Sequence, residues 1–323
     1  MSLSVPSIYE GASPLPAGPR WRPHPRARAF RSEGVRTRLF LLPVVLIALV
    51  LFLYPVGRDL YLSFTNFSGY SAKTNFVGFA NYRALLSQTA VSTGLAFTVM
   101  YAVATTVVVT VLAIPLAVVL NRRFVGRNLV RAALFFPAIP SLAILGLVWA
   151  YILAPISSGA INSLIGHLFG VGPVPWLSND LLARLSVIFV GVWSQVGWHS
   201  ILYLAYLQSI PADYYDAGQV DGASSWQRFF YITVPQLAPA MTVSCILLIT
   251  SGLNVYALPL SLTLGGPGYA TYTVMQNIIQ LGVNGDSIQY GQASALAVLF
   301  LLMVVTVLLV QVFLMRRREA RLR

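Results

Sequence analysis

Long apolar stretches alternate with short polar ones along most of the chain. Each stretch approaches or exceeds the ~20 residues that a helix needs to cross a ~30 Å hydrocarbon core. In lipid, only helices and closed barrels satisfy their backbone hydrogen bonds, and stretches this long are helical. We therefore expect six transmembrane helices, with both termini on the same side. The six stretches are Leu39–Val56, Leu95–Leu120, Ala132–Leu153, Leu185–Leu207, Met241–Leu262 and Ala293–Met315.

The composition is typical of a membrane protein. Hydrophobic residues make up 57% of the chain, charged residues only 9%, and the mean hydropathy is +0.74. A soluble domain has ~25% charged residues. The sequence therefore predicts an all-α, polytopic membrane protein. Its one cysteine, Cys245, lies inside an apolar stretch, so an intrachain disulfide is excluded.

The Lys and Arg residues predict which side of the membrane faces the cytoplasm. All but four of the 21 flank the stretches on one side, and the opposite side holds Arg58, Lys73, Arg83 and Arg184. Because cytoplasmic loops are enriched in Lys and Arg, we expect both termini and the loop 211–239 inside the cell. These flanks account for the net charge of +12, so nucleic acid is not an expected partner.

The same pattern divides the chain into four segments. Residues 1–38 are basic and rich in Pro and Ser, and we expect a disordered cytoplasmic arm that meets anionic lipid. A signal peptide is the alternative, but the next apolar stretch is long and no cleavage site follows it. Residues 39–94 hold the first transmembrane helix and an outer loop. Residues 95–315 hold a core of five helices with the cytoplasmic loop 211–239, and residues 316–323 form a basic cytoplasmic tail.

The expected spans carry no Asp, Glu, Lys or Arg, and this disfavours a carrier driven by protons or sodium. His199 lies in a span, where a helix-packing hydrogen bond is its ordinary role. A P-loop needs Gly-Lys-[Ser/Thr], but the only lysine, Lys73, follows Ala72. The sequence has no metal-binding or catalytic motif. We therefore expect no enzymatic activity and no cofactor, with any ATP used by a separate chain.

A polar stripe follows one face of the fourth stretch and continues in the fifth. Polar groups on a helix in lipid face protein or water. Hydroxyls, amides and an indole ring are the groups that a neutral sugar requires, so the stripe is a candidate substrate pathway. The alternative is that these groups only join helices to one another. The fourth stretch has Gly191, Ser194, Gln195, Trp198 and Leu202 at helical spacing, and the fifth has Ser251 and Asn254.

The loop 211–239 is the one long polar interruption on the cytoplasmic side that is not a basic flank. Pro211 and Asp213 favour the start of a helix, and Gly222 can end it by taking positive φ. Ser224 or Ser225 can cap a second short helix. One face of the first helix is mostly small, which lets another protein come close; a connector lying on the lipid headgroups is the alternative. That face holds Tyr214, Ala217, Gly218 and Asp221.

This loop resembles the "EAA loop" of ABC-importer permease subunits. That pattern is Glu-Ala-Ala, three residues, Gly, and after nine residues Ile-x-Leu-Pro; here it reads Asp216-Ala217-Gly218, Gly222 and Ile232-Thr233-Val234-Pro235. The spacing is kept, while Asp replaces Glu, Gly replaces Ala and Val replaces Leu. The resemblance implies that the loop docks in a groove of a separate ATPase subunit. The implied docking residues are Tyr214, Asp216, Ala217, Gly218, Asp221, Gly222, Ala223 and Pro235.

Two outer segments resemble carbohydrate-uptake permeases of the maltose and glycerol-3-phosphate type. They are residues 54–82, with Tyr54-Pro55 and Phe76-Val77-Gly78, and residues 265–295, with Gly265-Gly266-Pro267. The resemblance covers about residues 39–315 and implies the transmembrane domain of a type I ABC importer in a bacterial inner membrane. It also implies four kinds of partner: a second homologous permease subunit, two ATPase subunits, an extracytoplasmic solute-binding protein and a sugar.

In relatives of the maltose type, the spans on either side of the docking loop contact the sugar. By position, this implies Ser194 and Trp198 before the loop, and Ser251, Gly252 and Asn254 after it. Two other functions stay open. A facilitative carrier or channel would work without partners, and a membrane scaffold would explain the docking loop but not the polar stripe. The substrate stays open among a disaccharide, a monosaccharide, a polyol and glycerol-3-phosphate.

Overall fold

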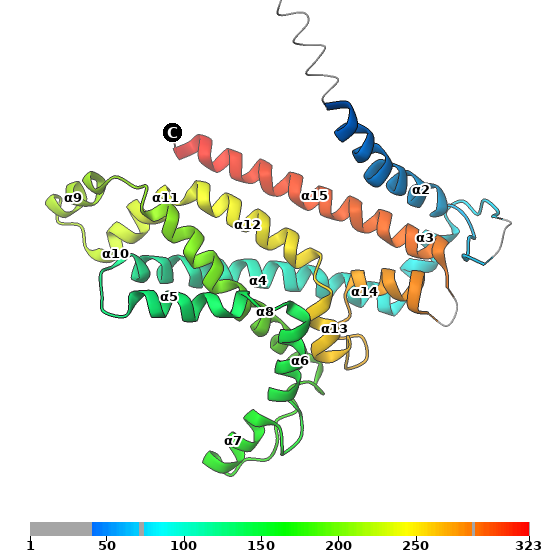
Figure 1. Ribbon diagram of the computed structural model, residues 1–323, viewed down its shortest axis with the longest axis horizontal. Coiled ribbons are helices and arrows are strands. Elements are labelled where there is room, and N and C mark those ends of the chain that lie inside the picture. The colour runs from blue at the N-terminus through cyan, green and yellow to red at the C-terminus, as the bar shows by residue number, and fades with distance from the viewer. Residues whose placement is uncertain (1–40, 71–73, 286–287, 323) are drawn as a thin grey trace, which may run out of the picture. The chain divides into compact units, whose positions relative to one another are not determined.

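The computed structural model describes residues 41–70, 74–285 and 288–322 (Figure 1). The expected N-terminal arm, residues 1–38, lies outside this part of the chain. The chain divides into two compact units, residues 1–56 and 57–323. The described residues are 76% helical, and their β-pairing is an isolated bridge between Thr65 and Phe76. The expected all-α class is confirmed.

Residues 41–56 of the first unit are helical and include a π-helical turn, η1 (Leu49–Leu53). They belong to a candidate span, Leu41–Leu62, of 22 residues. Its apolar side chains are exposed over residues 41–56, which suits a helix surrounded by lipid. The helix extends past the expected end at Val56, because α2 (Tyr54–Leu62) continues it.

The second unit contains the remaining helices of the described residues. In chain order these are α3 (Ala80–Leu86), α4 (Thr89–Asn121), α5 (Arg127–Phe135), η2 (Phe136–Ala138), α6 (Leu142–Ile152), α7 (Ala160–Phe169), α8 (Asp180–Leu207), α9 (Ala212–Val220), α10 (Ser225–Arg228), η3 (Phe229–Thr233), α11 (Val234–Gln236), α12 (Ala238–Leu253), α13 (Ala257–Thr263), α14 (Val274–Ile279), η4 (Gln280–Asn284) and α15 (Tyr290–Leu322). The last of these runs as one helix through most of the expected tail 316–323.

A bundle of α4, α8 and α12 forms the core of the second unit, and the three helices lie side by side in Figure 1. Leu120, Tyr203 and Leu248 are almost completely buried between them. Gly252 lets α12 approach α4 closely, since a Cβ there would lie 2.7 Å from Cα of Ala102. Small residues at such crossings are the usual means of packing helices in a membrane. Gly252 is therefore a packing residue.

The third expected span, Ala132–Leu153, is not one continuous helix. Its two parts, Arg127–Ala138 and Leu142–Ile152, meet at 95°. Pro137 and Pro140 lie at the break, and each proline lacks the N–H that a continuous helix would need. The Ser141 side chain then accepts a hydrogen bond from the backbone N–H of Ile144 and caps α6. The expectation of an unbroken helix here is wrong.

The fifth expected span, Met241–Leu262, is also broken. Helix α12 ends at Leu253, and α13 begins after a short turn. Pro259 lies in the first turn of α13, where backbone N–H groups have no partner within the helix, so the proline does not kink α13. Counting only single helices, four in the described part of the chain are long and apolar enough to span a membrane. The number rises to six if each of two bent pairs, the one at 95° and Ser225–Gln236 with Ala238–Leu253 at 67°, is one span.

Candidate functional site

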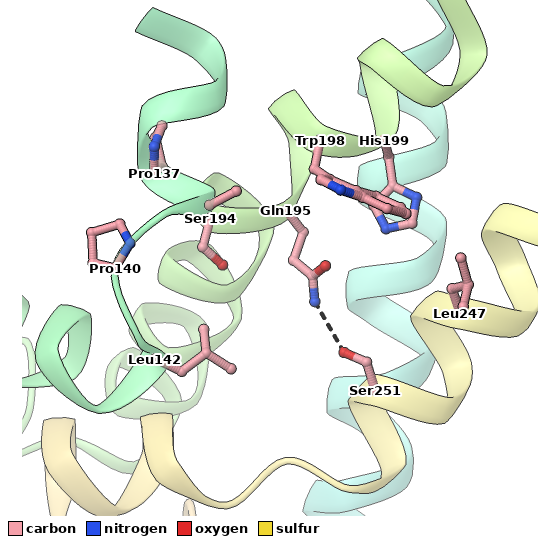
Figure 2. Close-up of a pocket in the computed structure, with 10 residues that line it drawn as sticks. Pro137, Pro140, Leu142, Ser194, Gln195, Trp198, His199, Leu247 and Ser251 are labelled. Carbon is pink, nitrogen blue, oxygen red and sulfur yellow. Dashed lines mark hydrogen bonds between the residues drawn. The ribbon is translucent and has the colours of Figure 1, made fainter. Parts of the chain in front are cut away.

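A pocket of about 350 Å³ opens between α8, α12 and the break before α6. Figure 2 shows residues from all three elements around it. It combines neutral polar groups with an indole ring, and no Asp, Glu, Lys or Arg lines it. The lining residues are Pro137, Ala138, Pro140, Leu142, Ser194, Gln195, Trp198, His199, Leu247 and Ser251.

The polar groups of the pocket come mainly from one face of α8. Asn179 caps this helix by accepting hydrogen bonds from the N–H groups of Leu181 and Leu182. Further along, the Ser194 hydroxyl donates to the carbonyl of Gly191, 2.8 Å away. The Gln195 amide nitrogen donates across the pocket to the Ser251 hydroxyl on α12, at 3.0 Å (Figure 2). Gln195 and Ser251 therefore close a bridge between the two helices that flank the docking loop.

Trp198 and His199 play different parts although they are neighbours. The Trp198 side chain is 38% exposed and lies edge-on to the His199 ring, with 4.7 Å between ring centroids. The His199 ring is buried, and its Nδ1 is 2.7 Å from the Ser244 hydroxyl on α12. The expected helix-packing hydrogen bond of His199 is confirmed. Trp198 is thus the aromatic surface offered to a ligand, and His199 fixes α8 against α12 behind it.

One wall of the pocket was not expected from the sequence. Pro137, Ala138 and Pro140 form it where the third span breaks (Figure 2). In a continuous helix these residues would have been ordinary positions on the helix surface. Two prolines three residues apart inside an apolar stretch were the available signal, because an internal proline ends or kinks a helix.

Asn254 lies outside the pocket, unlike the other four candidate pathway residues. Ser194, Gln195, Trp198 and Ser251 all line it. The Asn254 side chain is exposed and donates to the carbonyl of Thr250 in its own helix, 2.8 Å away. It sits directly after the end of α12, so the helical spacing that would align it with Ser251 is interrupted there.

The second candidate site, the docking loop 211–239, folds by local rules. Gly222 has φ of 74°, which ends α9 as expected. The N–H of Gly222 donates to Gln219 and that of Ala223 donates to Gly218, at 3.1 and 2.9 Å, and this pair forms a Schellman motif. Ser224 caps α10 in a capping box with Gln227. These caps fix the turn between the two short helices.

The two faces of α9 have different surroundings. Tyr214, Asp216, Ala217 and Asp221 are exposed, with Tyr214 at 51%. Gly218 faces inward, since a Cβ there would lie 2.9 Å from Cδ1 of Ile232. Ala223 and Pro235 are half-buried beside the loop's turns. The small size of Gly218 therefore serves packing within the loop, and the exposed face consists of the other residues.

Neither site has the features of a catalytic or metal centre. Within the described residues, no three His, Cys, Asp or Glu side chains lie close enough to hold a metal ion. The pocket presents hydroxyls, an amide and aromatic edges. Such groups bind a neutral polar molecule by hydrogen bonding and stacking.

Known proteins give a consistent comparison. Residues 109–323 match the family "Binding-protein-dependent transport system inner membrane component". The probable starch degradation products transport system permease protein AmyD of Thermoanaerobacterium thermosulfurigenes is 31% identical, covering 91% of this chain and 98% of its own. The trehalose/maltose transport system permease protein MalF of Thermococcus litoralis is 32% identical, covering 83% of this chain and 89% of its own.

A solved structure shares the fold. It is a chain of a bacterial ABC transporter that imports the acidic polysaccharide alginate, with a TM-score of 0.76 and 23% identity, covering 90% of this chain and 99% of that one. A related crystal structure holds the alginate transporter in complex with a periplasmic protein bound to an alginate pentasaccharide; its chain has the same TM-score and 24% identity, covering 90% of this chain and 98% of that one. Together with the family match, the bent helices and the loop, this assigns the chain: it belongs to the binding-protein-dependent transport system inner membrane components.

Proposed function

We propose that this chain is the permease subunit of an ATP-driven sugar importer. It forms half of the translocation pathway and couples to a separate ATPase through residues 213–235 of the docking loop. The observation that carries the proposal is the position of this loop between α8 and α12, the two helices that meet across the polar pocket. A force on the loop therefore acts on both sides of the pocket.

The pocket chemistry supports a neutral sugar as the solute. Gln195 and Ser251 present an amide and a hydroxyl, which both donate and accept hydrogen bonds. Trp198 adds a flat apolar ring for the C–H face of a sugar. The lining has no cation to hold a carboxylate or phosphate. Two of the relatives carry names for starch degradation products and trehalose/maltose, which agrees with this class.

The exposed face of α9 supports an ATPase as the partner of the loop. Tyr214, Ala217 and Asp221 lie at helical spacing and are solvent-exposed. No helix of the described bundle covers them. In the proposed cycle, ATP binding closes a pair of ATPase subunits, and the docking loop moves with them. This motion rearranges α8 and α12 and turns the cavity outward, where a solute-binding protein delivers the sugar.

The proposed assembly has a second, homologous permease subunit that completes the pathway. The six apolar stretches expected from the sequence give no other source of energy, because they hold no Asp, Glu, Lys or Arg for ion coupling. Reconstituted alone in vesicles, the chain should not conduct sugar. Sugar uptake should require both permeases, the ATPase, ATP and the binding protein. Uptake by the isolated chain would instead identify a facilitative carrier.

Cross-linking tests the coupling directly. In a Cys245→Ala background, Ala217→Cys should form a cross-link with the ATPase subunit in assembled transporter. Val171→Cys is the matched control, because it is also exposed but lies in the loop expected outside the cell. A cross-link to the ATPase from residue 171, or labelling of residue 217 by an impermeant thiol reagent added outside, would contradict the proposal.

A further inference from the structure

A second, smaller pocket lies where the docking loop joins the helix bundle. Its volume is about 180 Å³, below the ~300–1,000 Å³ of typical small-molecule sites. The ends of α4 and α8 form one side of it, and α9 and η3 of the docking loop form the other. The lining residues are Val118, Asn121, Arg122, Leu207, Tyr215 and Thr233.

Each polar side chain of this pocket can donate a hydrogen bond. The Tyr215 and Thr233 hydroxyls lie 3.2 Å apart and share one hydrogen bond, so the second hydroxyl hydrogen is left to donate. The Thr233 side chain is 96% buried, given its exposure of 4%, while Arg122 is exposed at the rim. Arg122 brings five N–H donors and a permanent charge, and Asn121 adds an amide.

No acidic side chain balances this charge in the described residues. None lines the pocket, and the described residues contain no ion pair between Arg122 and a carboxylate. Arg123, on the same short segment between α4 and α5, and Arg127, the first residue of α5, are also cationic. The three acidic residues of the docking loop, Asp213, Asp216 and Asp221, are exposed and do not contact the pocket. A cation beside hydroxyl and amide donors, with no carboxylate lining the cavity, suits an anion.

We propose that this pocket binds a phosphate group, held by Arg122 together with the Tyr215 and Thr233 hydroxyls. Phosphate matches the site because its oxygens accept several charge-assisted hydrogen bonds from an arginine and neighbouring hydroxyls. An anionic phospholipid of the inner leaflet is the source that the surroundings favour. Val118 and Leu207 make the remaining walls apolar, and the exposed Val111, Leu112 and Val119 on α4 provide a surface for an acyl chain.

A ligand in this pocket ties the docking loop to the bundle. Tyr215 lies on α9 and Thr233 on η3, whereas Arg122 follows α4. A bound phosphate adds contacts between these parts that the protein alone does not make. The inference goes beyond the proposed sugar transport, and it concerns how firmly the loop is held to the helices that it moves.

Binding is measured on the full-length chain, independently of transport. The chain is placed in nanodiscs of phosphatidylcholine with about one tenth phosphatidylglycerol, and retained phosphatidylglycerol is counted by native mass spectrometry after release. In a second arm, radiolabelled inorganic phosphate is added to nanodiscs of phosphatidylcholine alone. Arg122→Gln should lower the affinity for the retained ligand by about tenfold, the scale of a lost hydrogen bond to a charged group.

Arg123→Gln is the matched control, because it removes the same charge from the same segment but does not line this pocket. It should change the affinity by less than about twofold, as for an exposed charge. Tyr215→Phe and Thr233→Val remove one hydroxyl each and should weaken binding while Arg122 is intact. These two variants keep the test valid if Arg122→Gln lowers the yield of folded protein.

The arms separate the two sources of phosphate. Arg122-dependent retention of phosphatidylglycerol supports the pocket with lipid as its ligand. Arg122-dependent binding of inorganic phosphate, with unchanged lipid retention, supports the pocket with a soluble ligand. Equal losses in Arg122→Gln and Arg123→Gln would show attraction to surface charge alone and overturn the proposal, as would binding in neither arm.

Discussion

The docking loop and the pocket are adjacent in the chain but differ in how their functional side chains contact the rest of the protein. On the loop, the Ala217 and Asp221 side chains are exposed. In the pocket, Ser194, Gln195 and His199 each make a hydrogen bond within the protein. A substitution on the loop should therefore affect a partner and leave the fold intact, whereas one in the pocket changes the solute contacts and the helix packing together.

The largest effect is expected from Gly222→Tyr in the docking loop. Nothing lies within 4 Å of a Cβ at this position, so the first side-chain atom has open space around it. It would occupy the surface that we propose binds the ATPase, where overpacking costs about 1–3 kcal/mol, or up to ~100-fold in uptake. Uptake of labelled sugar by the assembled transporter measures the loss, and membrane insertion should be unchanged.

Gly126→Tyr is the control for backbone strain. Gly126 has φ of 82°, also has open space around a Cβ, and lies in the other cytoplasmic connection. Both substitutions place a non-glycine residue in the left-handed region at a cost of ~1–2 kcal/mol. Equal losses of uptake in the two variants would remove the special role of the docking loop.

Trp198→Ala should give the next largest effect, and it tests the pocket. Truncating an aromatic anchor typically costs more than 1 kcal/mol of binding, so we expect the sugar concentration for half-maximal uptake to rise about tenfold. The maximal rate should change less. Phe189→Ala on the same helix is the control, because Phe189 is exposed and does not line the pocket. Similar kinetics in both variants would exclude Trp198 from sugar binding.

Ser244→Val tests the packing behind the pocket. It leaves Nδ1 of the buried His199 without its partner, at a cost of about 1–3 kcal/mol. For a protein of this size that corresponds to a fall of several degrees in the midpoint of thermal unfolding in detergent. The double variant His199→Leu/Ser244→Val should recover part of the loss, because it removes both polar partners. No change in Ser244→Val would mean that the bond does not hold α8 to α12.

The smallest effect is expected from Asn254→Ala. Its amide is exposed and bonds only to Thr250 in its own helix, so uptake should stay within about twofold, as for surface substitutions. Ser251→Ala is the comparison, since Ser251 lines the pocket and bonds Gln195. A loss of uptake in Asn254→Ala equal to that in Ser251→Ala would return Asn254 to the substrate pathway.

The contrast between the two sites also explains what the sequence could predict. The docking loop depends on short-range rules, and both the positive φ of Gly222 and the cap at Ser224 follow from neighbouring residues. The polar face of α8 follows from helical spacing, because that helix is continuous. The inward face of Gly218 depends on Ile232, fourteen positions later, and sequence spacing does not contain that contact.

The breaks in two spans were harder to predict, because the hydropathy of the sequence does not change at them. The residues around Pro137 are as apolar as those of an unbroken helix, so the stretch 132–153 suggested one span. At the end of α12, the close approach of Gly252 to Ala102 is a contact between distant parts of the chain. These tertiary contacts and the two prolines decide where the helices stop, and with them which side chains reach the pocket.

The proline wall has a consequence for which solutes can pass. Pro137 and Pro140 have φ fixed by their rings, and the wall between them carries no polar side chain. In the proposed pathway this rigid wall would exclude solutes by their size, and it has no side chain that hydrogen-bonds to their hydroxyls. Relatives that keep this wall but vary residues 194, 195 and 251 would discriminate among sugars of one size. Transport of a longer or shorter sugar would require substitutions in the wall.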